Sequence, residues 1–552
     1  MRIPGGVPSA HVDQFARSLL PPKEAWPILD YSGEPFSHYP DYINAASALL
    51  DSAIAEGYGD KPAIHFDGNT WTYRHLSDRV DRIARVLVED YGLVPGKRVL
   101  LRSGNTPMLV ACWLAVLKAG GICVTTMPLL RAAELAFILD RVGVSIALCE
   151  ESLAAEMEAA RKSAGAIEHV GYFTPAGRGN SHSADIDRAL ETKPASFNSV
   201  RTAADDIALI TFTSGTTGKA KAAAHFHRDI LAICEGYPRA FTVNAGDIIC
   251  GSPSMAFTYG LAAFLIYPLR YRASVVLVPR PTPDYLLHAI DRYKVNSLYC
   301  VPTSYYQMLG ELDKCDISSL RKCASAGENL QTQLWTRWHE RTGIRLVNGL
   351  GATEMLTHFL SESMGVDHIG STGLAVPYYT VRLIDGEGQL LPLDSRGRLA
   401  VRGPTGCRYL DDPDRQRAFV INGWNVTGDV CVQDRDGYFW FVDRADDMIV
   451  SSGYNISPQE VERALAEHPL VSECAVVAVK DSARGNLVRA CVVLTDPDLA
   501  TPKTARELQE FVKNRIAPYK YPRDVRFYKD LPRTHTGKIQ RNALRLMSEN
   551  EN

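Results

Sequence analysis

The chain has 552 residues, a formal net charge of −3, and 46% hydrophobic and 22% charged residues. This length is too great for a single hydrophobic core, so we expect two or more domains. The near-neutral charge balance gives no reason to expect a nucleic acid or an anionic membrane surface as a partner. Residues 1–15 contain no apolar run of signal-peptide length, so we expect no secretion signal.

The most apolar helix-like stretch covers residues 108–124. Lys118, Gly120 and Gly121 interrupt it before it reaches the roughly 20 residues that a bilayer span needs. We interpret it as a buried helix that runs into a strand, and we expect no membrane insertion.

The 12 cysteines are scattered, without a C-x-x-C pair or a His/Cys cluster at metal-binding spacing. This pattern predicts reduced core cysteines in a cytoplasmic protein. The sequence leaves open whether the protein is a monomer or a homodimer.

Short β-branched runs alternate with helical patterns between residues 60 and 380. Alternation of this kind predicts mainly parallel sheets covered by helices, which is an α/β fold. The clearest predicted strands are residues 98–102, 207–211, 274–278 and 297–301, and residues 73–90 form an amphipathic helical pattern.

The pattern changes in the last third of the chain. Closely spaced strands with Asp-Gly turns over residues 380–443 predict a small antiparallel, barrel-like part. After residue 450 a compact α+β pattern follows. The polar stretch 443–447 separates the two, so we predict a large N-terminal domain (1–443), a hinge (444–447) and a small mobile C-terminal domain (448–552). Within the latter we expect helices at 458–466 and 505–515 and strands at 474–479 and 489–494.

The strongest local signal is residues 211–221, a run of glycines, hydroxyl residues and lysines directly after a predicted strand. Backbone N–H groups and hydroxyls can surround phosphate oxygens, and a lysine can neutralise them. Only two residues separate Gly215 from Gly218, so the standard P-loop spacing fails. A Gly/Thr-rich surface turn is the alternative, but the biased composition at a strand end favours a phosphate loop.

This loop resembles the T-S-G-T-T-G-x-P-K-G phosphate loop of the adenylate-forming superfamily, which includes acyl-CoA synthetases, luciferases and peptide-synthetase adenylation domains. Ala220 replaces the usual Pro and Ala222 the usual Gly. The resemblance extends from about residue 60 to residue 541. Its further motifs follow in order at residues 325–328, 348–354, 423–429, 443–447 and 532–541.

The resemblance implies an ATP site with defined roles. Formation of an acyl-adenylate requires a carboxylate to attack the α-phosphate of ATP, so cationic groups and Mg²⁺ must offset the repulsion of two anions. By resemblance, Glu354 is the Mg²⁺ ligand and Thr353 contacts the α-phosphate. Asp429 binds the ribose, and Arg444 reaches the ribose or stabilises the hinge. The implied ATP- or AMP-binding set is Thr213, Ser214, Gly215, Thr216, Thr217, Gly218, Lys221, Gly327, Glu328, Asn348, Gly349, Asp429 and Arg444.

Lys538, together with Thr353 and Glu354, makes up the predicted catalytic set. By resemblance Lys538 lies on the mobile C-terminal domain and bridges the substrate carboxylate and the ATP phosphate, where a point charge stabilises the transition state. The family then rotates this domain about a hinge residue, here Asp446, so that coenzyme A can reach the adenylate. The implied CoA channel consists of His227, Ser452, Gly453 and Tyr454.

The acid is predicted to be aromatic. Amino-acid-activating relatives place an Asp in the acyl pocket, and residues 253–260 contain no carboxylate. The sequence looks closest to benzoate-CoA and especially 2-aminobenzoate-CoA ligases, through residues 11–16, 257–261 and 353–356. The implied pocket is Phe257, Thr258, Tyr259, Gly260, Ala326, Gly351, Thr357 and His358.

Two departures from the benzoate ligases lie in this pocket. Thr258 stands where they have Ala, and Thr357 stands before His358 where they have His directly. The two added hydroxyls indicate a ring with a polar substituent; alternatively, both threonines point into the protein and bond to backbone.

The predicted function is therefore that of an ATP-dependent aryl-CoA ligase acting on 2-aminobenzoate or another ortho-substituted benzoate, such as salicylate. The partners would be this small acid, ATP and CoA, with Mg²⁺. One alternative is a benzoate- or medium-chain or alicyclic acyl-CoA synthetase. Another is a non-catalytic nucleotide-binding protein on the same scaffold, although Lys538, Glu354 and Asp429 are all present. A luciferase-like monooxygenase shares the adenylation step and is set aside only because the pocket resembles that of aryl ligases.

Overall fold

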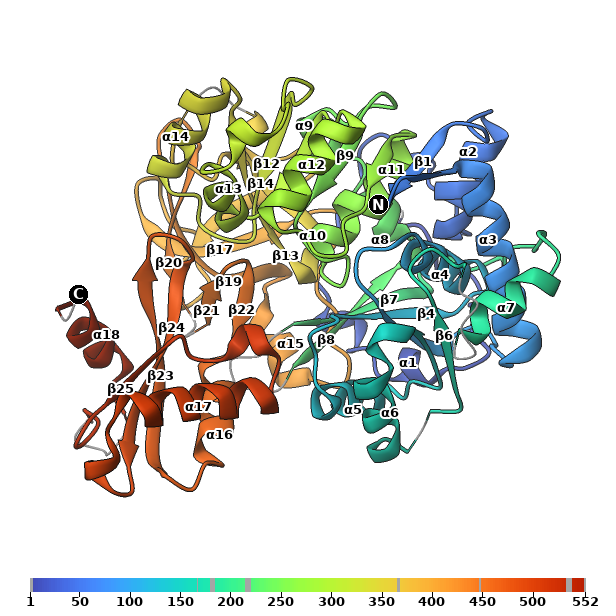
Figure 1. The fold of residues 1–552 in the computed structure, drawn as a ribbon. Coiled ribbons are helices and arrows are strands. Elements are labelled where there is room, and N and C mark those ends of the chain that lie inside the picture. The colour runs from blue at the N-terminus through green and yellow to red at the C-terminus, as the bar shows by residue number, and fades with distance from the viewer. Residues whose placement is uncertain are drawn as a thin grey trace.

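The computed structural model describes residues 3–165, 167–178, 184–213, 220–364, 368–445, 448–532 and 539–550. These residues form two helix-covered sheets, an antiparallel sheet and a C-terminal α+β lobe (Figure 1). The predicted α/β fold class is confirmed.

The first sheet has six strands in the order β6-β5-β3-β4-β7-β8. All neighbours are parallel except β8, which runs antiparallel to β7. Every residue of β3 and of β4 is buried, as expected when helices cover both faces of a parallel sheet. The strands are β3 (Arg98–Arg102), β4 (Ile122–Thr126), β5 (Ile146–Glu150), β6 (His169–Phe173), β7 (Ile207–Thr213) and β8 (Lys221–Phe226).

The helices of this first part follow the predicted pattern. All residues of α4 are buried and β4 follows it, so the predicted buried helix running into a strand is confirmed. Thr106 caps α4 by accepting the N–H of Leu109, and Pro107 occupies its first turn. The helices are α1 (Phe15–Ser18), α2 (Ser52–Ala55), α3 (Tyr73–Arg85), α4 (Pro107–Lys118), α5 (Ala132–Arg141), α6 (Ala154–Ser163) and α7 (Asp185–Thr192). Within the described part of the chain, no helix is long and apolar enough to cross a membrane.

The second sheet has nine strands in the order β15-β14-β13-β12-β11-β9-β10-β1-β2. Its centre is parallel and both ends are antiparallel. The strands are β1 (Pro62–Phe66), β2 (Asn69–Thr72), β9 (Ile248–Gly251), β10 (Ser274–Val276), β11 (Ser297–Cys300), β12 (Lys322–Ser325), β13 (Leu346–Ala352), β14 (Thr357–Ser361) and β15 (Leu374–Ala375). The helices are α8 (His227–Ala232), α9 (Tyr237–Phe241), α10 (Thr258–Leu261), α11 (Tyr267–Tyr271), α12 (Pro283–Tyr293), α13 (Pro302–Met308) and α14 (Thr332–Thr342).

An antiparallel sheet follows, which confirms the predicted change of pattern after residue 380. Its order is β16-β17-β19-β18, and β20 pairs with β19. The elements are β16 (Thr380–Ile384), β17 (Arg396–Arg402), α15 (Pro413–Phe419), β18 (Val420–Ile421), β19 (Trp424–Gln433) and β20 (Phe439–Arg444).

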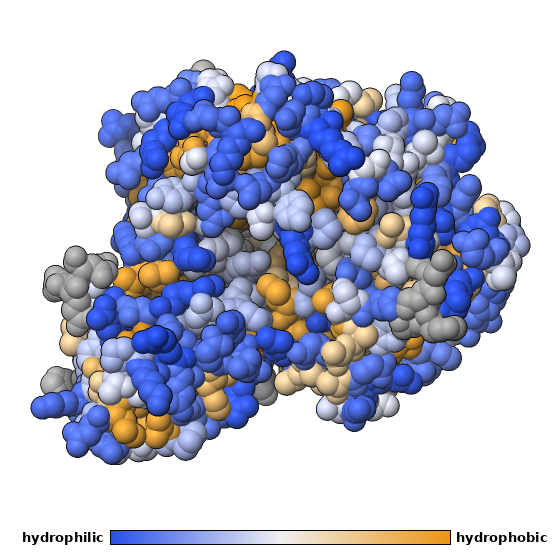
Figure 2. Space-filling view, in the orientation of Figure 1, coloured by the Kyte–Doolittle hydropathy of each residue, from blue (hydrophilic) through white to orange (hydrophobic). Residues whose placement is uncertain are grey.

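The C-terminal residues form a lobe with its own core, which includes Val461, Leu465, Val476 and Leu508. Figure 2 shows this lobe at the lower left, where it projects from the rest of the molecule. The predicted α+β pattern is confirmed, while the boundaries at 443 and 448 stay predictions. The elements are β21 (Ile449–Ser451), β22 (Tyr454–Ile456), α16 (Pro458–Ala466), β23 (Val471–Asp481), β24 (Gly485–Leu494), α17 (Pro502–Arg515), β25 (Asp524–Phe527) and α18 (Arg541–Asn550).

Candidate active site

A cavity of about 1090 Å³ lies where the sheets and the C-terminal lobe meet. Strand ends of the two large sheets, α10, β19, β20 and the β21–β22 turn all contribute to its wall. This is the place where α/β proteins usually bind ligands. Of the predicted site residues, those that line it are Thr213, Lys221, Phe257, Thr258, Tyr259, Gly327, Gly351, Thr353, Glu354, Thr357, His358, Asp429, Arg444, Gly453 and Tyr454.

Glu354 is held in place by Tyr409, whose hydroxyl donates to its Oε1 at 2.5 Å. The two residues come together because the segment around Tyr409 pairs antiparallel with β8 at Ala223. Lys221 begins β8, and its Nζ lies 5.3 Å from the centroid of the Tyr409 ring. One carboxylate and one ammonium group of the cavity wall therefore both contact the same buried aromatic residue.

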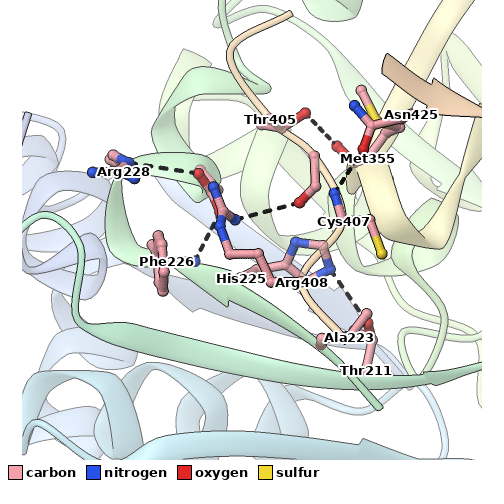
Figure 3. A network of polar contacts seen from close by, with 12 residues as sticks. Thr211, Ala223, His225, Phe226, Arg228, Met355, Thr405, Cys407, Arg408 and Asn425 are labelled. Carbon is pink, nitrogen blue, oxygen red and sulfur yellow. Dashed lines mark hydrogen bonds and ion pairs between the residues drawn. The ribbon is translucent and has the colours of Figure 1, made fainter. Parts of the chain in front are cut away.

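A buried ion pair supports this arrangement from behind (Figure 3). The Arg408 guanidinium donates to Asp229 Oδ2 at 2.9 Å, and neither side chain is exposed. The same carboxylate oxygen accepts the backbone N–H of Phe226, and the guanidinium lies 4.2 Å from that residue's ring centroid. Because removing one partner of such a pair is costly, the segment that carries Tyr409 is firmly anchored.

Asp429 and Arg444 form the next part of the wall. They are paired in register across β19 and β20, and Arg444 Nη1 donates to Asp429 Oδ1 at 2.9 Å. Asp429 is buried on the cavity side. The structure therefore brings the two residues together, while their roles toward a ribose stay predictions.

The predicted acyl pocket contains a hydroxyl pair. Thr357 Oγ1 and the Tyr267 hydroxyl lie 2.9 Å apart, and both residues line the cavity. Thr258 also lines it, and the orientation of the two threonines toward the substrate stays a prediction. Thr357 Oγ1 also donates to the His358 carbonyl oxygen at 3.4 Å, so both hydroxyl protons are engaged within the protein and the pair offers acceptor lone pairs to a ligand.

His358 lies beside this pair, 5.0 Å from Tyr259 and 4.4 Å from Tyr237 between ring centroids. Burial lowers the pKa of its imidazole to about 4, so the ring is neutral at pH 7. Its Nδ1 has no hydrogen-bond partner among the residues that the structure describes.

The C-terminal lobe closes the cavity with the β21–β22 turn. Gly453 has φ of +80°, and a Cβ built on it would lie 2.8 Å from Cγ1 of Val301. A Cβ built on Gly327 would lie 4.0 Å from the Gly453 Cα. Tyr454 follows, with its ring edge-on to Phe257 at 6.1 Å. The close approach and the positive φ both require glycine at position 453.

Several predicted residues do not face this cavity. His227 is wholly buried, its Nδ1 accepts the N–H of Ala45, and it does not line this cavity, so its place in the CoA channel stays a prediction. The Ser452 hydroxyl accepts from Arg484 instead of lining the channel.

Two predicted ATP contacts are also turned away from the cavity. The Glu328 carboxylate accepts the Thr303 hydroxyl at 2.9 Å, and burial raises the pKa of Glu328 to about 7. The Asn348 amide donates to Ser371 O. Their side chains therefore support the wall. Others lie behind it: Gly349 packs on His358, Gly260 packs against Ser254 O, and Ala326 is buried.

Seven predicted positions fall outside the described residues. These seven are Ser214, Gly215, Thr216, Thr217 and Gly218 of the phosphate loop, Asp446 of the hinge and Lys538. Their neighbours Thr213 and Lys221 both line the cavity.

Sequence reasoning missed Tyr409 and Tyr267. Tyr409 is 55 residues from Glu354, and Tyr267 is 90 residues from Thr357. Each is a buried aromatic residue in an apolar setting, which indicates a core position. No local signal in the sequence distinguishes such a site residue from a core residue.

Comparison with known proteins identifies the class. Residues 52–408 match the AMP-binding enzyme family and residues 460–538 match the AMP-binding enzyme C-terminal domain. The chain therefore belongs to the AMP-binding enzyme family, and the prediction of an adenylate-forming enzyme is confirmed.

Its relatives include CoA ligases. The chain is 33% identical over 525 residues to a benzoate–CoA ligase of Thauera aromatica, covering 94% of this chain and 99% of that protein. It is 33% identical over 537 residues to human mitochondrial acyl-coenzyme A synthetase ACSM5, covering 92% and 90%. Among solved structures, the anthranilate CoA ligase AuaEII in complex with anthranoyl-AMP is 29% identical with a TM-score of 0.72, covering 93% and 99%. The predicted likeness to AMP-forming acid–thiol ligases near the benzoate-CoA ligases is thus confirmed.

Proposed function

We propose that this enzyme is an aryl-CoA ligase: it forms an acyl-adenylate from an aromatic acid and ATP, releases pyrophosphate, and transfers the acyl group to CoA. The observation that carries this proposal is the single cavity that joins an aromatic pocket to Glu354, Asp429 and the Gly453 turn. A flat pocket walled by Tyr259 and Phe257 suits an aromatic ring. The 12 free cysteines, most of them buried, support a reducing cytoplasm as its location.

The experiment is acid-dependent ATP–pyrophosphate exchange followed by assay of the CoA thioester. Benzoates are expected to support both steps. Medium-chain fatty acids and cyclohexanecarboxylate test the aliphatic alternative, which is favoured by the likeness to ACSM5. If none of the acids supported exchange, the non-catalytic alternative would be favoured.

We further propose that the preferred acid carries a polar ortho group, 2-aminobenzoate first and 2-hydroxybenzoate second. The acceptor lone pairs of the Thr357–Tyr267 pair and the His358 Nδ1, which has no partner among the described residues, offer the ring substituent a polar partner. Plain benzoate leaves such a group unpaired, which costs about 1–3 kcal/mol. The printed name of AuaEII, an anthranilate CoA ligase, agrees with this choice, whereas that of the Thauera enzyme agrees with plain benzoate.

Replacing Thr357 with valine is expected to shrink the preference for the ortho-substituted acid. The wild-type preference for 2-aminobenzoate over benzoate is expected to be about 10- to 100-fold in kcat/KM, from roughly 1.4 kcal/mol per decade. Valine keeps the shape and removes the hydroxyl, and Thr357→Ser is the matched control because it keeps the hydroxyl. A wild-type enzyme that prefers benzoate or the alicyclic acid would overturn this choice of substrate.

We propose that Glu354 holds Mg²⁺ together with the ATP phosphates. No cluster of three or more His, Cys, Asp or Glu that could hold a metal occurs in the described ranges, so the protein supplies few ligands. Mg²⁺ commonly takes one or two carboxylates and completes its shell with water and substrate phosphates, and Glu354 on the cavity wall fits this pattern. When bound, the ion offsets phosphate charge as the acid approaches.

Removal of the Tyr409 hydroxyl is expected to weaken MgATP binding. In Tyr409→Phe the Glu354 carboxylate loses its charge-assisted hydrogen bond, which contributes about 1.5–3 kcal/mol, so the Kd for MgATP is expected to rise about 10-fold or more. Calorimetric titration with MgATP measures this without turnover. Tyr438→Phe, outside the cavity, is the control. An unchanged Kd in Tyr409→Phe would show that Tyr409 does not position Glu354.

A further inference from the structure

A buried ion cluster joins the C-terminal lobe to the N-terminal domain at the edge of the cavity. Lys520 Nζ lies 2.5 Å from Glu134 Oε1 and 2.5 Å from Glu460 Oε1. The exposed fractions of the side chains are 6% for Lys520, 14% for Glu134 and 17% for Glu460. We call these three residues the interdomain latch, because Glu134 belongs to α5 and the other two belong to the C-terminal lobe.

A second contact reinforces the latch. Arg131 Nη2 donates to the Lys513 carbonyl oxygen at 3.3 Å, again from the start of α5 to the C-terminal lobe. The backbone N–H of Arg131 donates to Glu134 Oε2 at 2.9 Å, so one carboxylate caps α5 and reaches Lys520 at the same time. Figure 1 shows one end of α17 close to α5, in agreement with these contacts.

The latch is connected to the cavity by aromatic contacts. Tyr519 precedes Lys520, and its ring stacks on Tyr454 at 4.3 Å. Tyr454 follows Gly453 and meets Phe257 of the acyl pocket edge-on. Fixing Lys520 against α5 therefore also fixes the turn that carries Gly453.

Charged pairs with so little exposure are weakly screened by salt, and each member depends on the others for neutralisation. Without Glu134, Lys520 would still form its ion pair with Glu460 of the same lobe. It would lose its ion pair with the N-terminal domain, since Glu134 is the only carboxylate of that domain that pairs with it among the described residues. The fold of each domain would remain, but the preferred orientation of the lobe would be lost.

We propose that Glu134 is a positioning residue for the CoA-transfer step: through Lys520 it holds the lobe in the orientation in which Gly453 lines the cavity. This inference rests on the proposed CoA ligation. Adenylate formation depends instead on Lys538, which the family resemblance assigns to a different orientation of the lobe, so that step does not need the latch.

The test is Glu134→Gln, with the two half-reactions measured separately. Glutamine keeps the size and an oxygen that accepts the Arg131 N–H, and it replaces the charged oxygen that faces Lys520 with an uncharged amide group. Transfer of the acyl group from supplied benzoyl- or 2-aminobenzoyl-adenylate to CoA is expected to fall about 10-fold, while ATP–pyrophosphate exchange stays within about twofold. Glu134→Asp keeps the charge and is expected to retain more transfer activity than Glu134→Gln.

A double-mutant cycle with Lys520→Met separates positioning from a general loss of structure. In the Lys520→Met background, Glu134→Gln is expected to cause no further loss of transfer, because the carboxylate no longer has a cation to hold. Glu168→Gln is the matched control, since Glu168 pairs with Lys97 inside the N-terminal domain at 2.8 Å.

Equal losses in both half-reactions, unchanged transfer in Glu134→Gln, or additive losses in the double variant would each overturn the proposal. These results differ from failure of the proposed function. In that case the wild-type enzyme itself would show no acid-dependent exchange or no thioester.

Discussion

Replacing Lys538 with alanine is expected to abolish adenylate formation while leaving CoA transfer from a supplied acyl-adenylate largely intact. As the carboxylate attacks the α-phosphate, negative charge gathers where the family resemblance puts this ammonium group. Loss of one such preorganised group costs about 2.7–4 kcal/mol, which is a 10²- to 10³-fold slower reaction. Acid-dependent ATP–pyrophosphate exchange measures the first step, and thioester formation from the adenylate measures the second.

Lys529→Ala is the control for this experiment. Lys529 is an exposed lysine of the same lobe and does not line the cavity. It is expected to leave both half-reactions unchanged. If Lys538→Ala slowed both half-reactions equally, the assignment of separate lobe orientations to the two steps would be wrong.

The fold was predictable where local patterns decide it. The strand at residues 98–102 and the helix at residues 458–466 have the predicted bounds, because a short apolar run and a Ser-Pro helix start are local signals. Bounds were less accurate where tertiary pairing extends an element. β23 runs from Val471 to Asp481, beyond the predicted 474–479, because β24 pairs with it along almost its whole length.

The candidate site was predictable to the extent that its residues lie in contiguous motifs. Glu354, Asp429 and Gly453 each belong to such a motif, and all three line one cavity. The contacts that hold them were not predictable, since they join residues far apart in sequence. Tyr409 reaches Glu354 from 55 residues away, and Lys520 reaches Glu134 from 386 residues away.

The position of His227 away from the cavity has a different physical cause. Two histidines lie close together where β8 passes into α8, and the sequence does not show which way either ring points. The structure buries His227 against the backbone of Ala45 and lowers the pKa of its imidazole to about 3 through burial. His225 is buried as well, with Nε2 3.3 Å from Thr211 Oγ1.

Replacing Gly453 with tryptophan is expected to block CoA transfer while sparing adenylate formation. The residue lies beside Gly327 on the cavity wall, and even a Cβ would lie 2.8 Å from Val301 Cγ1, so an indole fits only if neighbouring groups shift. We expect it to obstruct the approach of the CoA thiol, which the family resemblance places beside this glycine. Transfer is expected to fall at least about 100-fold, equivalent to roughly 2.7 kcal/mol of barrier.

The positive φ of Gly453 adds a second effect that must be separated from blockage. A side chain at φ of +80° is strained by about 1–3 kcal/mol wherever it occurs. Gly485 supplies the matched control: it has φ of +73°, lies in the same lobe, and has nothing within 4 Å of a built Cβ. Gly485→Trp is therefore expected to carry similar strain and to leave transfer within a few-fold of wild type, since it does not obstruct the cavity. If Gly485→Trp impaired transfer as much as Gly453→Trp, strain in the lobe, rather than an obstructed thiol path, would explain the loss. If Gly453→Trp stopped adenylate formation as well, Gly453 would belong to the wall that both steps share.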